Sequence, residues 1–81
     1  MNSQVLEKET ALSRQDEIDR LERRARRRLG SRVRDFRLLL QDTGLILQGI
    51  AFTYHAKQLA QHAIMEESRL PILANEIEVT S

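Results

Sequence analysis

The chain of 81 residues contains no cysteine, no tryptophan, a single proline, two phenylalanines and one tyrosine. Without cysteine it can form no disulfide, no thiolate nucleophile and no cysteine-ligated zinc site. No apolar run approaches the roughly 20 residues that span a bilayer, and residues 1–12 lack the basic-then-apolar plan of a signal peptide. We therefore expect a cytoplasmic protein as written, or a peripheral membrane or periplasmic one if a leader is removed from a longer precursor.

The length leaves room for one domain with a modest core. Small domains bury a smaller fraction of their surface than large ones, so their stability is marginal. A binding partner or a second copy of the chain would add stability.

The net charge of +1 hides an uneven distribution. Residues 14–37 hold ten arginines against five acidic residues, a balance of +5, and residues 42–81 hold five acidic residues against Lys57 and Arg69, a balance of −3. The chain is therefore basic around the end of its first predicted helix and mildly acidic towards its C-terminus.

Residues 36–51 carry two apolar runs joined by the only turn signal that can fold one onto the other. Phe36, Leu38 and Leu40 alternate with the positions 37, 39 and 41 (Arg, Leu and Gln), a period of two that is typical of a strand with one buried face. The Asp42-Thr43-Gly44 segment predicts the turn, because aspartate can bond nearby backbone N–H groups and glycine can adopt positive φ. The stretch is therefore predicted to be a β-hairpin.

Two amphipathic helices are predicted to flank the hairpin. Ser13 fits the N-cap of the first, after a disordered arm of residues 1–12, and Gly30 fits the residue that ends it. Thr53 fits the N-cap of the second, and Pro71 forbids its continuation. The predicted apolar face of the first helix is Ile18, Leu21, Ala25 and Leu29, and that of the second is Ala56, Leu59, Ala60, Ala63 and Ile64.

The last segment, residues 72–79, alternates Leu73, Ile77 and Val79 with polar positions and is predicted to be a closing strand. The order helix, strand, strand, helix, strand predicts an α+β fold. We expect a two-layer sandwich of a three-stranded sheet with both helices on one face, in a single domain over residues 13–81. The pattern leaves open which hairpin strand the last strand joins.

Three features of the chain resemble the BON domain, a family of small bacterial modules found mostly in envelope, osmotic-stress and nodulation-related proteins. They are the order of elements, the segment from Thr43 to Gly49 (TGLILQG), and the spacing of Leu73, Asn75, Ile77 and Val79. The resemblance implies a non-enzymatic module that binds phospholipid surfaces or supports assembly of envelope proteins.

An arginine cluster is the first candidate binding feature. Several bases near an acidic leaflet give reversible, salt-sensitive attachment, whereas the simpler interpretation is a solvated helix face. Nucleic acid is an alternative ligand, although the three aromatic residues form no stacking row and no GXXG or RNP-like motif is present. The residues assigned to anionic-surface binding are Arg23, Arg24, Arg26, Arg27, Arg28, Arg32, Arg34 and Arg37.

The outer face of the predicted sheet is the second candidate. Alternation places Leu39, Ile46 and Ile50 on the side away from the helices, where no predicted element covers them. An exposed apolar patch on a small domain indicates a partner, so we expect a protein partner or a homodimer here. The simpler interpretation is that the arm around Val5 and Leu6 folds over the patch.

Three residues are predicted to have structural roles. Gly44 belongs to the turn, Gly49 marks a bulge or a close approach by a helix, and Asn75 bonds to backbone near a strand end.

No catalytic constellation is recognisable in the sequence, since no nucleophile is paired with a base and no glycine loop could hold a phosphate. His55, His62 and Glu66 have helical spacing that could hold a metal, but exposed histidines on a polar face are the favoured interpretation. We therefore predict no enzymatic activity, no metal, no cofactor and no small-molecule substrate.

Overall fold

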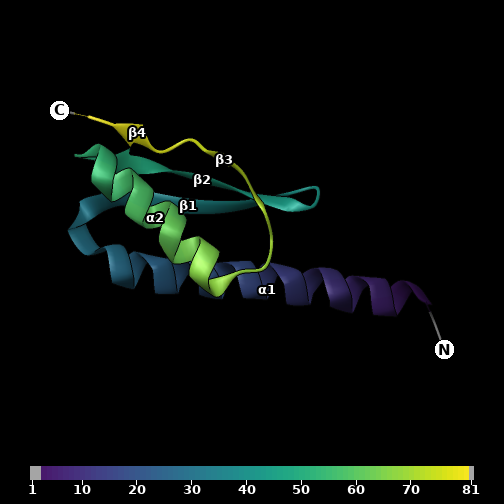
Figure 1. Cartoon of the computed structure of the whole chain (residues 1–81). Coiled ribbons are helices and arrows are strands. Elements are labelled where there is room, and N and C mark those ends of the chain that lie inside the picture. Colours follow the sequence, from purple (N-terminus) through teal and green to yellow (C-terminus); the bar gives the residue numbers. More distant parts are fainter. Residues whose placement is uncertain (1–2, 81) are drawn as a thin grey trace.

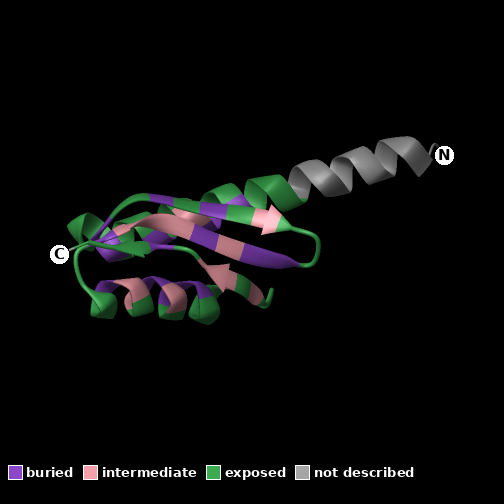
Figure 2. Ribbon diagram, turned by 90° about the horizontal axis from the view of Figure 1, so that it is seen from above, coloured by how far each residue is buried: buried purple, intermediate pink, exposed green. Residues whose placement is uncertain are grey.

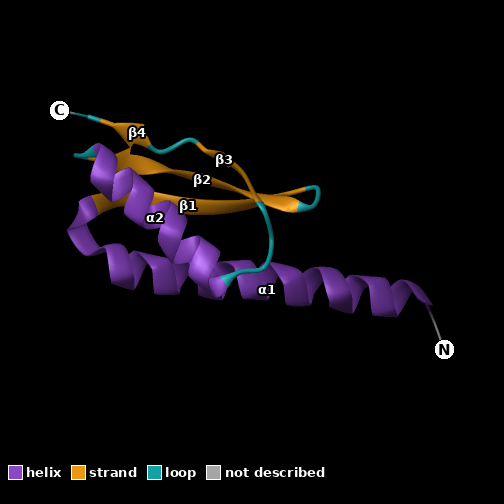
Figure 3. Ribbon diagram, in the orientation of Figure 1, coloured by secondary structure: helices purple, strands orange, loops and turns teal. Residues whose placement is uncertain are grey.

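The computed structural model describes the backbone of residues 3–80 and the side chains of residues 14–80. Its sheet is mixed, because the central strand β2 pairs antiparallel with β1 and parallel with both β3 and β4 (Figures 1 and 3). The predicted α+β class is confirmed, with four strands in place of three. The elements are α1 (Ser3–Leu29), the 3-10 turn η1 (Gly30–Arg32), β1 (Val33–Gln41), β2 (Gly44–Ala51), α2 (Tyr54–Glu67), β3 (Ile72–Asn75) and β4 (Glu78–Val79).

One side of the sheet, here called the inner face, packs against the helices. Helix α2 crosses all four strands, and α1 packs along β1 and against α2 (Figure 1). The buried side chains of both helices and of the inner face form one core. Figure 2 marks the buried positions along the ribbon in purple. The largest side chains that are fully buried in this core are Phe36, Leu45, Leu47, Ile64 and Ile77.

Helix α1 is longer than the sequence indicated. It begins at Ser3, so residues 3–12, expected to be a disordered arm, are helical, and Ser13 lies inside the helix and not at its N-cap. The reason is local, because residues 3–13 contain neither glycine nor proline and are rich in helix-forming residues. The predicted end is confirmed, since the helix stops at Leu29 and Gly30 adopts a φ of 57°.

The hairpin turn has the predicted place but a different conformation. Gln41 pairs with Gly44, so Asp42 and Thr43 form a two-residue loop, and the positive φ of 53° is at Asp42 and not at Gly44. Position 44 requires glycine because the neighbouring residues leave no space for a side chain. A Cβ atom there would lie 2.5 Å from Leu73 Cγ and 2.8 Å from the Pro71 carbonyl oxygen.

A β-bulge interrupts the pairing of β1 with β2. The register passes from the pair of Arg34 with Ile50 to the pair of Arg37 with Gln48, so two residues of β1 face Gly49 alone. Asp35 in the bulge has a φ of 53°, and Gly49 has a φ of 151° with Arg34 O only 3.1 Å from the position of a Cβ. Of the two predicted roles of Gly49, a bulge or a close approach by a helix, the structure shows the bulge.

Helix α2 begins at its predicted cap, since the hydroxyl oxygen of Thr53 accepts a hydrogen bond of 3.0 Å from the backbone N–H of Ala56. At its other end, Ser68 N donates to Ile64 O at 2.9 Å, and Pro71 follows. The helix therefore ends where the sequence indicated.

The predicted closing strand is split into β3 and β4, and both join β2. Asn75 is the last residue of β3, next to the break, and its Oδ1 accepts from Ile77 N at 3.2 Å while its Nδ2 donates to Lys57 O at 3.2 Å. The prediction that Asn75 bonds to backbone is confirmed. The break also corrects the predicted alternation, because Ile77 is buried while Leu73 and Val79 are exposed.

Candidate functional site

The arginines that the sequence grouped as one surface occupy three different environments. Two of them are engaged in contacts that hold the fold together, a second set lies on the exposed side of α1 and in the following turn, and a third set lies on β1. The contacts of each set determine which of them can meet a ligand.

Arg26 is bound to the edge of the sheet. Its Nε and a terminal nitrogen donate to the carbonyl oxygen of Phe36 at 3.0 and 2.8 Å, and it also lies 3.7 Å from Glu22. Glu22 in turn accepts a hydrogen bond of 2.8 Å from Leu38 N. The pair satisfies backbone groups on the free side of β1 that an edge strand otherwise leaves open. Arg26 is therefore a structural residue.

Arg28 is engaged as well, because its guanidinium lies 2.9 Å from the carboxylate of Glu66 on α2. This ion pair joins the two helices at the surface.

The same carboxylate, that of Glu66, was a candidate metal ligand in the sequence together with His55 and His62. Both histidines are exposed. Within residues 14–80, no group of three histidine, aspartate or glutamate side chains is placed to hold a metal ion.

Arg23, Arg24 and Arg27, here called the helix arginines, lie on the exposed side of α1. The core residues Leu21 and Ala25 lie on the buried side of the same turns. Among the side chains of residues 14–80, none pairs with the helix arginines in a salt bridge. Arg32 follows them in the exposed turn η1. This set keeps its charge available to an external anion.

Arg34 and Arg37 belong to the outer face, the side of the sheet away from the helices. In the strand register, Arg34 on β1 pairs with Ile50 on β2, which pairs with Glu78 on β4. The next row contains Arg37, Gln48 and Glu76, and Gln48 Nε2 donates to Glu76 Oε1 at 3.2 Å. The outer face therefore carries two arginines on β1 and, on the opposite side of β2, the acids Glu76 after β3 and Glu78 on β4.

The same face is apolar towards the hairpin turn. Leu39 on β1 pairs with Ile46 on β2, and Ile46 pairs with Ala74 on β3. Leu39 is 43% exposed and Leu73 is 50% exposed. The structure thus brings two of the three predicted partner-binding residues together, whereas Ile50 lies between Arg34 and Glu78. Val5 and Leu6, the alternative cover for this face, lie outside the described side chains.

A hollow opens on the outer face beside the bulge. It has a volume of about 470 Å³, and Gly49 contributes no side chain to it. Three carboxylates border it, those of Asp35, Glu76 and Glu78, together with the guanidinium of Arg37. No sequence pattern indicated this hollow, because the bulge brings Asp35 beside acids that lie about 40 residues further along the chain.

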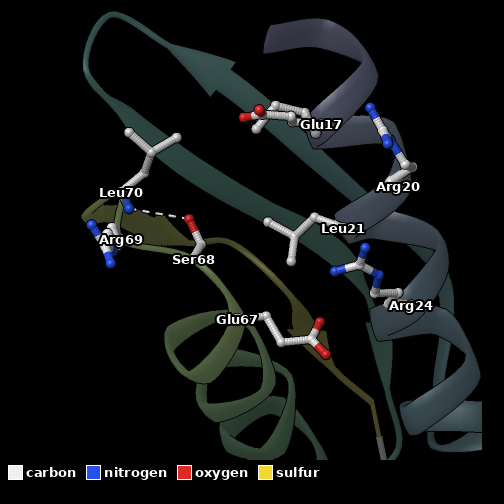
Figure 4. A pocket seen from close by; sticks show the side chains of 9 residues that line it. Glu17, Arg20, Leu21, Arg24, Glu67, Ser68, Arg69 and Leu70 are labelled. Carbon is white, nitrogen blue, oxygen red and sulfur yellow. Dashed lines mark hydrogen bonds between the residues drawn. The ribbon is translucent and has the colours of Figure 1, made fainter. Parts of the chain in front are cut away.

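A second concavity, of about 540 Å³, lies between α1 and the end of α2 (Figure 4). Ile18 and Leu21 supply its apolar part. Charges of both signs surround it, from Glu17, Arg20, Arg24, Glu67 and Arg69. The mixture favours no single class of charged ligand.

Comparison with protein-family models, curated proteins and solved structures finds no match for this chain. The resemblance to the BON domain stays a prediction. Over residues 3–80, no helix has the length and apolar character that crossing a membrane requires.

Proposed function

We propose that this domain is a non-enzymatic binding module that attaches to anionic phospholipid surfaces through the helix arginines, with Arg32 beside them. The observation that carries the proposal is that Arg23, Arg24 and Arg27 are all exposed on one helix and form no salt bridge with any side chain of residues 14–80. Arg24 also borders the concavity between α1 and α2. The other side of α1 is held against β1 and α2, so these arginines project from a fixed support.

The charges suit a surface better than a single small ligand. A small anion needs groups that converge in a cavity, but the helix arginines follow one another along an exposed helix. An acidic leaflet offers many phosphates in a plane, and each basic residue near it contributes about 1 kcal/mol. Three or four such residues give reversible attachment that salt weakens. The resemblance to the BON domain supports the same class of ligand.

The proposal is tested by co-sedimentation of the 81-residue chain with vesicles of phosphatidylcholine alone and of phosphatidylcholine mixed with phosphatidylglycerol. We expect binding to the anionic vesicles only. The double variant R23Q/R27Q removes two charges, and at about 1 kcal/mol each this weakens binding roughly thirtyfold. The matched control K57Q/R69Q removes two charges from α2 and the loop after it, and we expect a much smaller effect.

Equal binding to both kinds of vesicle would contradict the electrostatic mechanism, and equal loss in the two double variants would contradict the assignment to α1. Nucleic acid is the alternative ligand for the same arginines. A gel shift with a short DNA duplex at low salt, combined with no binding to anionic vesicles, would favour that alternative over the lipid surface.

A further inference from the structure

We propose that the outer face of the sheet is a homodimer interface, in which two copies of this chain stack their sheets face to face about a two-fold axis parallel to the strands. This inference is independent of the lipid proposal, because the interface uses none of the helix arginines. It rests on the way in which charge and apolar surface are distributed on the outer face.

Charge and apolar character vary in two directions on the outer face. Across the strands, the β1 side carries Arg34 and Arg37 against one carboxylate, that of Asp35 in the bulge, so it is basic on balance. The opposite side is acidic at Glu76 and Glu78. Along the strands, these charged rows lie at the bulge, and the apolar row of Leu39, Ile46 and Ala74 lies nearer the hairpin turn.

The two sides of opposite charge do not neutralise each other within one copy. Neighbouring strands are about 4.8 Å apart, so β1 and β4, on either side of β2, are separated by roughly 10 Å. Between the side chains of residues 14–80, neither Arg34 nor Arg37 forms a salt bridge. Gln48 alone reaches Glu76 by a hydrogen bond. The basic and acidic sides are both left to interact with something outside the chain.

A second copy of the chain is complementary to this face both across the strands, where the charge changes sign, and along them, where charged rows give way to the apolar row. Rotation by 180° about an axis parallel to the strands, in the plane between two stacked sheets, exchanges the two lateral sides and preserves position along the strands. The basic side of each copy then lies over the acidic side of the other, and the apolar row lies over its own equivalent. The contact is isologous, as in most dimers, and it places Arg37 opposite the partner's Glu76.

Other dimer axes and other partners are less complementary in charge to the outer face. A two-fold axis in that plane but perpendicular to the strands would place arginine over arginine and glutamate over glutamate. A partner whose surface carried charge of one sign would leave one side of this face unmatched, and like charges across an interface oppose binding. The choice of a second copy follows from this self-complementarity.

The hollow beside Gly49 gives the partner's arginine side chain a place to enter. It is bordered by the carboxylates of Asp35, Glu76 and Glu78, and a guanidinium can donate to several carboxylate oxygens at once.

The first test measures association of the 81-residue chain by sedimentation equilibrium up to millimolar concentration. We expect a monomer–dimer equilibrium, and we expect L39E to raise the dissociation constant roughly tenfold or more, because it places a charge in the apolar row. The matched control is M65E, since Met65 is 59% exposed on α2, outside this face. Circular dichroism of each variant verifies that it remains folded.

The second test exchanges charges. R37E alone places two glutamates opposite each other, and E76R alone places two arginines opposite each other, so each should raise the dissociation constant roughly tenfold. The double variant R37E/E76R restores opposite charges in the dimer, and we expect association close to that of the original chain. This rescue is specific to the proposed register.

A chain that stays monomeric at millimolar concentration would overturn the inference. So would an equal effect of L39E and M65E, or a double charge exchange that associates no better than either single exchange. Vesicle binding by R23Q/R27Q is measured separately, so failure of the dimer and failure of the lipid proposal are distinguishable.

Discussion

Leu38 and Leu39 are adjacent in β1 and have the same side chain, yet Leu38 is 4% exposed and Leu39 is 43% exposed. Arg26 and Arg27 are adjacent in α1 and both are exposed, but their contacts differ. Arg26 donates two hydrogen bonds to Phe36 O, while Arg27 forms no salt bridge with any side chain of residues 14–80. One member of each pair contacts the rest of the fold and the other faces outward. Residue type alone does not separate stability from binding in this domain; the direction of the side chain does.

The largest expected difference in the free energy of unfolding is between variants of Leu38 and of Leu39. Replacing Leu38 with alanine leaves a cavity in the core and should lower the free energy of unfolding by about 2–5 kcal/mol. Replacing Leu39 with alanine should change it by no more than about 0.5 kcal/mol. The measurement is urea denaturation at low micromolar concentration, where association does not contribute. Similar losses in the two variants would show that the outer face is covered within the monomer.

Replacing Arg26 should lower the free energy of unfolding more than replacing Arg27, but the difference should be smaller than that between the two leucines. R26A leaves Phe36 O without its donors and Glu22 without its cation, and we expect a loss of about 1–3 kcal/mol in the free energy of unfolding. R27A should lie within about 0.5 kcal/mol of the original chain. Thermal and urea unfolding measure both. A stable R26A variant would mean that water replaces the guanidinium at the β1 edge without cost.

The smallest effect concerns the ion pair between Arg28 and Glu66, which joins the two helices but is exposed to solvent. A double-mutant cycle with R28A, E66A and R28A/E66A should give a coupling energy of about 0.2–1 kcal/mol that decreases with added salt. A coupling energy above about 2 kcal/mol would place this pair with Arg26 among the contacts on which the fold depends.

Patterns within a few residues predicted much of the fold. Alternation in residues 36–40 identified the buried side of the hairpin, Gly30 and Thr53 marked ends of helices, and Gly49 marked the bulge. Each depends on local geometry, namely the period of a strand, the positive φ after a helix or the orphan N–H groups of a first turn. The start of α1 was missed because Ser13 can cap a helix but does not interrupt one.

Contacts between distant segments were not predictable in the same way. The hydrogen bonds of Arg26 and Glu22 with β1, and those of Asn75 with α2, each join two elements whose relative position the sequence does not state. The last strand is split after Asn75, and a register shift between β2 and β3 leaves Leu73 unpaired and exposed. The partners of Arg26 and Arg28 within the fold were not predictable for the same reason.

The sequence by itself determined which elements form and which side of each is apolar, because propensity and periodicity act over a few residues. The tertiary structure alone decided which arginines remain available and how charge is arranged on the outer face. Those properties depend on strand register and on the packing of α1 against the β1 edge, which place residues far apart in the chain within a few ångströms of each other.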